Sequence, residues 1–236
     1  MLAAAGSGER LGAGGPKALV TLRGRPMLAW SIEAFARSAR VGAVVIAAPP
    51  GAEPEVERAA TAGDPQLAIS VVPGGASRSE SVSLALAAAD GETIAVHDAA
   101  RPLVTPELID ALVDELAARP DADGAIAAAP LTDTVKRARE PRPASGELPP
   151  GGAAIAKTES RDRLWAAQTP QVFRAAKLRA ALDADPERTA AATDDAMLVE
   201  QAGGTVLIHP APAANVKVTT PLELRLAELL LAEREH

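Results

Sequence analysis

One stretch near the start of the chain combines residue types that could bind a polyphosphate. Residues 3–17 read AAAGSGERLGAGGPK, with glycine at five positions and two cations, Arg10 and Lys17. Glycine lets the backbone turn sharply and bring its N–H groups close to a ligand. A loop of such N–H groups leading into a helix is an anion site, which fixed cations would strengthen. The stretch therefore predicts a pocket for a polyphosphate.

The common phosphate-binding motifs do not describe this loop. A Walker loop needs Gly-Lys followed by Ser or Thr, but here Pro16 precedes Lys17 and Ala18 follows it. A dinucleotide fingerprint needs a third small residue where Leu11 stands. The alternative interpretation is a flexible chain terminus with two stray charges, and the loop taken alone does not exclude it.

Composition narrows the classes of protein to consider. The 236 residues suffice for one large or two small domains with a substantial core. A net charge of −7 argues against broad binding to nucleic acid or anionic membranes. The absence of cysteine excludes disulfides and thiolate chemistry. Without a signal-peptide pattern or an apolar run long enough to cross a bilayer, we expect a soluble, cytoplasmic protein.

Apolar runs alternate with amphipathic segments along the chain, which favours an α/β fold. We expect strands at residues 41–48, 67–72, 93–96, 124–129, 165–173 and 205–209. We expect helices at residues 27–38, 54–62, 77–89, 106–118 (capped by Thr105), 175–182, 194–202 and 221–233. A helix between successive strands lets the chain cross over and enter the sheet again in the same direction. This alternation implies a Rossmann-like, mostly parallel twisted sheet with helices on both faces. Because so few residues precede Gly6, the first strand should be very short.

Three loops with polar or small residues follow predicted strands. They are residues 6–17, 74–81 and 97–101. In a parallel sheet the carboxyl ends of the strands share one edge, where ligands gather. We therefore expect the three loops to meet, which favours the anion site over a flexible terminus.

The alternating pattern breaks at residues 131–158, which are rich in Pro, Gly and charge. Residues 132–136 and 154–158 look like two short strands flanking a turn, which predicts a protruding β-arm. A disordered linker is the alternative. Exposed arms commonly pair with a partner, so we expect a homodimer through the arm. The chain is expected to form a single domain, 1–236, with the arm inserted at about 131–158.

A set of motifs follows in order along the chain. They are residues 4–11 (AAGSGERL) with 16–17 (PK), 74–82 (GGASRSESV), 97–102 (HDAARP), 133–136 (DTVK), 169–171 (TPQ), 193–195 (TDD) and 215–219 (NVKVT). The set resembles the 2-C-methyl-D-erythritol 4-phosphate cytidylyltransferase family of the non-mevalonate isoprenoid pathway. Each motif is weak alone, but the ordered set is specific and covers almost the whole chain. The short first strand and the long Pro- and Gly-rich arm tip depart from the family pattern.

The resemblance implies transfer of a cytidylyl group from CTP to 2-C-methyl-D-erythritol 4-phosphate, with release of pyrophosphate and with Mg²⁺ as the divalent cation. It assigns catalytic roles to Arg10, Lys17, Arg161 and Lys217. It places CTP on small residues, namely Ala4, Ala5, Gly6, Gly8, Gly75, Ala76, Ser81 and Ala99. It places the acceptor on Asp98, Arg101, Thr134, Thr169 and Thr193, and the metal ion on Asp98.

Alternatives stay open at this point. Asp98 could stabilise a turn, Arg161 could be a solvated member of the charged cluster at 159–163, and Ser81 could be an ordinary helix residue. We expect His97 to be structural, because an already ionised nucleophile needs no general base. A sister enzyme for another polyol phosphate, such as ribitol 5-phosphate, is the nearest rival. A non-catalytic nucleotide-binding regulator is disfavoured, because Arg10, Lys17 and Asp98 are all present.

Overall fold

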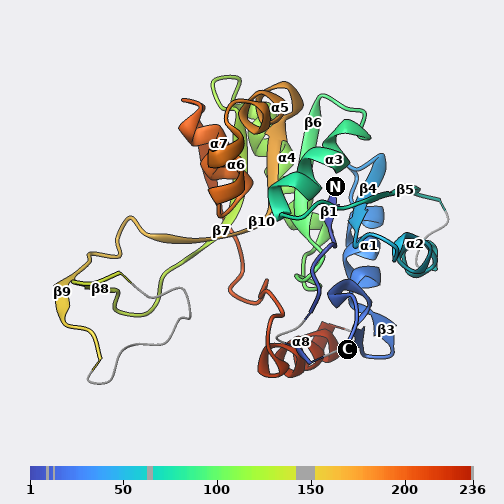
Figure 1. The fold of residues 1–236 in the computed structure, drawn as a ribbon, viewed down its shortest axis with the longest axis horizontal. Coiled ribbons are helices and arrows are strands. Elements are labelled where there is room, and N and C mark those ends of the chain that lie inside the picture. The colour runs from blue at the N-terminus through green and yellow to red at the C-terminus, as the bar shows by residue number, and fades with distance from the viewer. Residues whose placement is uncertain (9–10, 13, 63–65, 142–151, 235–236) are drawn as a thin grey trace.

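A seven-stranded sheet in the order β11-β7-β10-β6-β1-β4-β5 forms the centre of the molecule (Figure 1). This computed structural model describes residues 1–8, 11–12, 14–62, 66–141 and 152–234. The strands are β1 (Leu2–Ala3), β4 (Ala43–Ala48), β5 (Ala68–Pro73), β6 (Thr93–Asp98), β7 (Gly124–Pro130), β10 (Trp165–Arg174) and β11 (Val206–Pro210). The predicted α/β class with a mostly parallel sheet is confirmed.

Helices cover both faces of this sheet, as expected from the alternating pattern. They are α1 (Met27–Arg37), α2 (Glu53–Thr61), α3 (Arg78–Ala87), α4 (Pro106–Ala118), α5 (Ala175–Asp183), α6 (Pro186–Ala191), α7 (Asp195–Gln201) and α8 (Pro221–Arg234). Residues of α1, α2 and α4 pack with Val44 and Ile46 of β4. Residues of α3, α5 and α7 pack with the alternate residues Val45 and Ala47. Successive side chains of one buried strand thus supply two separate cores.

The first strand is as short as the sequence predicts, yet it lies in the middle of the sheet. Leu2 pairs with Ile46 of β4 on one side and with His97 of β6 on the other. The Leu2 side chain is completely buried, and Ala4 N donates to Ala47 O at 2.9 Å just beyond the strand. The residues that follow β1 therefore leave the sheet between the ends of β4 and β6.

Strand β10 is antiparallel to both of its neighbours, β6 and β7. The chain leaves the sheet at the end of β7, passes through the arm and returns directly beside β7 as β10. Two adjacent strands joined in this hairpin-like way must run in opposite directions. The sequence pattern indicated a strand at 165–173 but not its direction.

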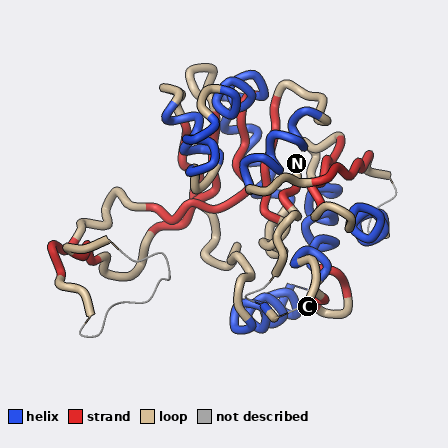
Figure 2. The backbone as a smooth tube through the Cα atoms, in the orientation of Figure 1, coloured by secondary structure: helices blue, strands red, loops and turns tan. Residues whose placement is uncertain are grey.

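The arm is built from two short antiparallel strands, β8 (Lys136–Ala138) and β9 (Ile155–Thr158), that stand apart from the sheet (Figure 2). The first strand of the arm was predicted at residues 132–136, but β8 lies further toward the C-terminus. Lys136 lies opposite Thr158, and Glu159 N donates to Val135 O at 3.0 Å, so pairing with the second strand sets this register. All residues of both strands are exposed. The predicted tip around residues 141–152 lies mostly outside the described residues.

Two small features had no signal in the sequence. Helix α6 was not predicted, nor was the hairpin of β2 (Thr21–Leu22) and β3 (Arg25–Pro26). Strands of two residues are too short for a hydrophobic period to be read. The hairpin and α8 bury Leu22, Val218 and Leu231 in a small cluster of their own. Within the described ranges, no helix is long and apolar enough to cross a membrane.

Candidate active site

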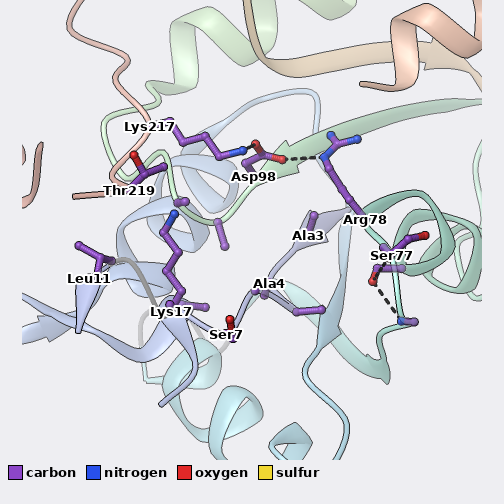
Figure 3. A pocket seen from close by; sticks show the side chains of 18 of the residues that line it. Ala3, Ala4, Ser7, Leu11, Lys17, Ser77, Arg78, Asp98, Lys217 and Thr219 are labelled. Atoms are coloured by element: carbon purple, nitrogen blue, oxygen red, sulfur yellow. Dashed lines mark hydrogen bonds and ion pairs between the residues drawn. The ribbon is translucent and has the colours of Figure 1, made fainter. Parts of the chain in front are cut away.

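The three loops expected at the strand ends do meet, and they enclose a cavity of about 650 Å³ (Figure 3). The first loop follows β1, the second follows β5 and the third follows β6, and the segment before α8 closes the fourth side. The cavity is lined by Ala3, Ala4, Ala5, Gly6, Ser7, Gly8, Leu11, Lys17, Ala18, Gly75, Ala76, Ser77, Arg78, Ser81, Asp98, Ala99, Ala100, Lys217 and Thr219.

The first loop is folded back on itself, which directs Lys17 into the cavity. Lys17 N donates to Gly6 O at 3.0 Å, and Leu11 N donates to Gly8 O at 2.9 Å. Gly8 has a φ of +75°, and a Cβ there would lie 3.1 Å from Gly15 O. An L side chain at Gly8 would therefore be strained and crowded. In Figure 3 the Lys17 side chain extends toward the wall that carries Asp98 and Lys217.

The second loop is held by Ser77, which caps α3, and by Glu80, which reaches back to the residue before the cap. Ser77 Oγ accepts from Glu80 N at 3.1 Å, and Glu80 Oε2 accepts from Ala76 N at 2.7 Å. Ser81 Oγ accepts from Gly75 N at 3.0 Å. The N–H groups of Gly75 and Ala76 are thus already bonded within the loop, so they are not free donors for a ligand.

Asp98, the last residue of β6, lies between two cations at the cavity wall. Its Oδ1 is 3.1 Å from Arg78 Nε, and its Oδ2 is 2.6 Å from Lys217 Nζ (Figure 3). Burial alone would raise the pKa of Asp98, but the charges of Arg78 and Lys217 outweigh it and hold the pKa well below its usual range. Asp98 is therefore a permanent anion at neutral pH.

Lys217 reaches Asp98 because its neighbours anchor the segment 215–219 to the third loop. Val218 is completely buried, and its N–H donates to Ala100 O at 2.8 Å. Asn215 Nδ2 donates to Thr169 O at 2.9 Å. These contacts bring Lys217 to the cavity that Lys17 also lines, although the two lysines lie near opposite ends of the chain.

His97 is buried directly behind Asp98, and both of its ring nitrogens are bonded. Nε2 donates to Arg101 O at 3.1 Å, while Nδ1 accepts from Thr169 Oγ1 at 3.0 Å. Thr169 Oγ1 in turn accepts from Asp98 N at 3.0 Å. Burial lowers the pKa of His97 to about 3, so the ring is neutral. This geometry fits the expected structural role of His97.

We expect His97 to make the free energy of unfolding fall as the pH drops below 6.5. The unfolded chain takes up a proton near the ordinary pKa of 6.5, whereas the folded chain does so only near pKa 3. Stability from this group is therefore complete above pH 6.5 and is lost toward pH 3. The loss should reach roughly 3 kcal/mol between pH 7 and pH 4. Urea unfolding at several pH values measures it, and an equally steep loss in His97→Gln would contradict the assignment.

The structure brings together many of the residues that the sequence singled out. The cavity lining includes Lys17, Lys217 and Asp98 together with Ala4, Ala5, Gly6, Gly8, Gly75, Ala76, Ser81 and Ala99. Arg10, one of the two predicted loop cations, lies outside the described residues.

Other predicted residues are found behind or away from this cavity. Arg101 Nη1 donates to Asn215 O at 2.7 Å, and Thr169 is buried beside His97. Thr193 is exposed, with its hydroxyl 3.7 Å from Met197 Sδ. Thr134 and Arg161 are exposed on the segments that join the arm to the sheet, where Arg161 donates to Thr132 O.

Arg78 is a site residue that the sequence reasoning missed. It is the first residue of α3, its side chain is 27% exposed, and it lines the cavity. Besides Asp98 it pairs with Asp195, at 2.9 Å from Nη2 to Oδ2. Burial would lower the pKa of Arg78, but Asp195 and Asp98 raise it above its usual value. The available signal was a charged residue directly after the helix cap Ser77, inside a loop already expected at the site.

The described part of the chain holds no cluster of three or more His, Asp or Glu side chains suited to a metal ion. Asp98 is the carboxylate among the described residues that line the cavity. Mg²⁺ usually takes one or two protein carboxylates and completes its shell with water and substrate phosphates. The donor set therefore fits Mg²⁺ as a companion of a bound polyphosphate, not as a resident ion.

Comparison with known proteins agrees with this arrangement. Residues 1–233 match the model of a family described as 2-C-methyl-D-erythritol 4-phosphate cytidylyltransferase. A protein of that name from Streptomyces coelicolor is 45% identical over 238 residues, covering 99% of this chain and 84% of that protein. One from Bordetella petrii is 42% identical, covering 95% and 94%.

A solved structure shows the same fold. The 2-C-methyl-D-erythritol 4-phosphate cytidylyltransferase of Thermus thermophilus superposes with a TM-score of 0.75 at 31% identity, covering 98% of this chain and 97% of that chain. At this coverage the match includes the sheet and the loops that form the cavity. The chain belongs to the 2-C-methyl-D-erythritol 4-phosphate cytidylyltransferase family.

Proposed function

We propose that the cavity binds CTP and that the phosphate of 2-C-methyl-D-erythritol 4-phosphate attacks the α-phosphorus there. The new bond joins that phosphorus to an acceptor phosphate oxygen, while the bond to the bridging oxygen breaks and pyrophosphate leaves. Both reactants are anions, so positioned cations are the main requirement. The observation that carries the proposal is the meeting of Lys17, Lys217 and Asp98 around one cavity beside a glycine loop.

The cations have two tasks in this proposal. Lys17 and Arg10 neutralise the triphosphate and the charge that develops as pyrophosphate leaves. Lys217 and Arg161 orient the acceptor phosphate, with Arg101 behind them. The acceptor phosphate is already ionised, so the reaction needs no general base, which agrees with a neutral, fully bonded His97.

The base of CTP is proposed to lie against the small residues of the first two loops. Any side chain at position 74 would collide with Ala5, since a Cβ on Gly74 would lie 2.6 Å from Ala5 Cβ. The N–H groups of Gly75 and Ala76 are bonded within the loop, so the backbone carbonyls of these loops are proposed as the groups that meet the base. Carbonyls accept from the exocyclic amino group of cytosine, a donor that uracil lacks.

Asp98 is the residue proposed to hold Mg²⁺ together with the phosphates of CTP. The bound ion would neutralise part of the triphosphate charge. Binding requires Asp98 to loosen its ion pair with Lys217, which is 41% exposed and can move toward the incoming phosphates. Mg²⁺ would then replace the Lys217 ammonium as the positive partner of Asp98, so the Asp98 carboxylate would stay paired with a cation.

A pyrophosphate-release assay tests the function directly. We expect release from CTP with 2-C-methyl-D-erythritol 4-phosphate, and at least about tenfold slower release with ribitol 5-phosphate or with UTP in place of CTP. Faster release with ribitol 5-phosphate would assign the chain to the rival polyol. No release with any acceptor, despite measurable CTP binding, would favour a nucleotide-binding regulator.

We further propose that the arm completes the acceptor site of a second copy of the chain. Arg161 and Thr134, both expected at the acceptor, lie at the arm and not in the cavity lining. The arm strands are exposed throughout, and Ile155 on the arm is 58% exposed. A homodimer would bury this surface and bring arm residues to a neighbouring cavity.

Mixing two inactive variants tests the shared site. Lys17→Ala removes a cavity cation and Arg161→Ala removes an arm cation. If cavity and arm come from different copies, mixed dimers have one site with both defects and one intact site. About a quarter of the parent activity should then return on statistical mixing. Failure to recover activity in dimers shown to exchange subunits would place Arg161 in its own chain's site or outside any site.

Two wider expectations stay predictions here. The chain is proposed to work as a single nucleotidyltransferase domain, 1–236, with the arm as an insertion. Its small-molecule substrates are consistent with a cytoplasmic enzyme that needs neither nucleic acid nor membrane.

A further inference from the structure

A second carboxylate holds the far end of Arg78. Asp195 is completely buried at the start of α7, and its Oδ2 lies 2.9 Å from Arg78 Nη2. The other end of the same guanidinium, Nε, is 3.1 Å from Asp98 Oδ1. Asp195, Arg78, Asp98 and Lys217 therefore form a row of alternating charges that runs from the protein interior to the cavity.

Stability alone explains this buried pair poorly. A buried carboxylate loses its hydration, and apolar residues often stabilise such a position as well as or better than an ion pair. Within the described parts of the chain neither carboxylate oxygen of Asp195 has a hydrogen-bond partner, so Oδ2 meets Arg78 as an ion pair only. The N-terminal end of α7 offsets part of the cost through the helix dipole. What the pair does supply is a fixed position for Arg78.

The start of α7 is itself anchored to the sheet. Gln171 of β10, which is buried, accepts from Ala196 N at 3.1 Å and donates to Asp194 Oδ2 at 2.8 Å. Asp194 caps the helix by accepting from Met197 N at 3.0 Å. Asp195 is therefore held from both flanks, so it can serve as a rigid attachment for Arg78.

We propose that Asp195 is a positioning residue for cytidylyl transfer, which retains Arg78 beside Asp98 when the substrates enter. The inference rests on the proposed role of Asp98. The phosphates of the two substrates attract the cations that line the cavity, and Lys217 is exposed enough to move toward the acceptor phosphate. Arg78 stays because Asp195 remains behind it. Without Asp195, Arg78 would shift toward the triphosphate, and Asp98 would lose the partner that orients it.

A double-mutant cycle tests whether Asp195 acts through Arg78. Asp195→Asn and Arg78→Gln should each lower kcat at least about tenfold, while the double variant should lie within about threefold of Arg78→Gln. KM for CTP should not rise in Asp195→Asn, because Arg78 becomes free to pair with the triphosphate. Independent, multiplying losses would overturn the proposal, as would a kcat within about threefold of the parent in folded Asp195→Asn.

The control for removal of a paired carboxylate is Asp123→Asn. Asp123 Oδ1 lies 3.1 Å from Lys177 Nζ, and the Asp123 side chain is 16% exposed. Neither residue is among those that line the cavity. Its kcat should match that of the parent. Melting followed by circular dichroism restricts the kinetic comparison to variants that are folded at the assay temperature.

A spectroscopic measurement makes the test independent of turnover. The Nε–H resonance of Arg78 is identified by its absence from Arg78→Gln. Its hydrogen exchange should be slow in the parent and at least about tenfold faster in Asp195→Asn, because one anchor is lost. Unchanged exchange would overturn the proposal. If the parent releases no pyrophosphate with any acceptor, the proposed function fails, and the exchange rates still decide whether Asp195 holds Arg78.

Discussion

Lys17→Ala is expected to lower kcat by about a hundredfold to a thousandfold. The lysine enters the cavity from the end of the glycine loop, where it faces the same space as Lys217. In the transition state of phosphoryl transfer, charge grows on the leaving pyrophosphate, and a preplaced cation stabilises that charge more than it stabilises the bound substrate. The effect should therefore fall mainly on kcat.

The fold should tolerate this change. The backbone at Lys17 is held by its N–H bond to Gly6 O at 3.0 Å, and the next residue, Ala18, is buried. Steady-state pyrophosphate release gives kcat, and a thermal melt gives the stability. Arg37→Ala is the matched control, since Arg37 is 71% exposed in a surface ion pair with Glu33. Parent-like turnover in Lys17→Ala would reject the proposed mechanism.

Arg10→Ala extends this test to the other cation of the loop. Its position lies outside the described residues, so the expectation rests on the sequence motif alone. We expect a loss of the same order as for Lys17→Ala. A parent-like Arg10→Ala beside an impaired Lys17→Ala would leave Lys17 as the cation of this loop on which the triphosphate depends.

Asp98→Asn should have the other large effect, a loss of kcat of about a hundredfold or more. The substitution keeps the shape of the side chain but removes the anion proposed to hold Mg²⁺. It also frees Lys217, whose ammonium is 2.6 Å from Asp98 Oδ2, to meet the triphosphate. KM for CTP should therefore not rise, although turnover falls. Asp123→Asn again serves as the control for loss of a paired carboxylate.

The opposite kinetic pattern would argue against this role. A higher KM for CTP with unchanged kcat would mean that Asp98 contributes only to ground-state binding. Titration of CTP binding against Mg²⁺ distinguishes the two cases without turnover, because the metal dependence of binding should weaken in Asp98→Asn.

Much of the site could be predicted because its signals are local. Ser77 and Thr105 each start a helix with an oxygen that accepts from an N–H three residues later, so neighbours in sequence determine the cap. The glycine loop carries its own chemistry, and strand ends place loops at one edge of a parallel sheet. These regularities led to the three loops that contain Lys17, Gly75 and Asp98, and the family resemblance assigned the roles of these residues.

The pairing of Arg78 with Asp195 could not be predicted in this way. The two residues lie on α3 and α7, and nothing in the spacing of their charges says that these helices meet. Thr169 likewise reads as a substrate residue in its motif, whereas the structure gives its hydroxyl two partners, Asp98 N and His97 Nδ1. Contacts of this kind depend on the order of strands in the sheet.

The amino-acid sequence by itself determined α1 to α5, α7 and α8, most strand positions, the cationic glycine loop and the family resemblance. Hydrophobic period, capping and motif order are properties of residues close together in the chain, whereas α6 had no such signal. Only the tertiary structure decided the direction of β10, the register of the arm and the row of charges from Asp195 to Lys217. The physical reason is that ion pairs and strand pairing act through space at a few ångströms, and the folded sheet alone sets which distant residues come that close.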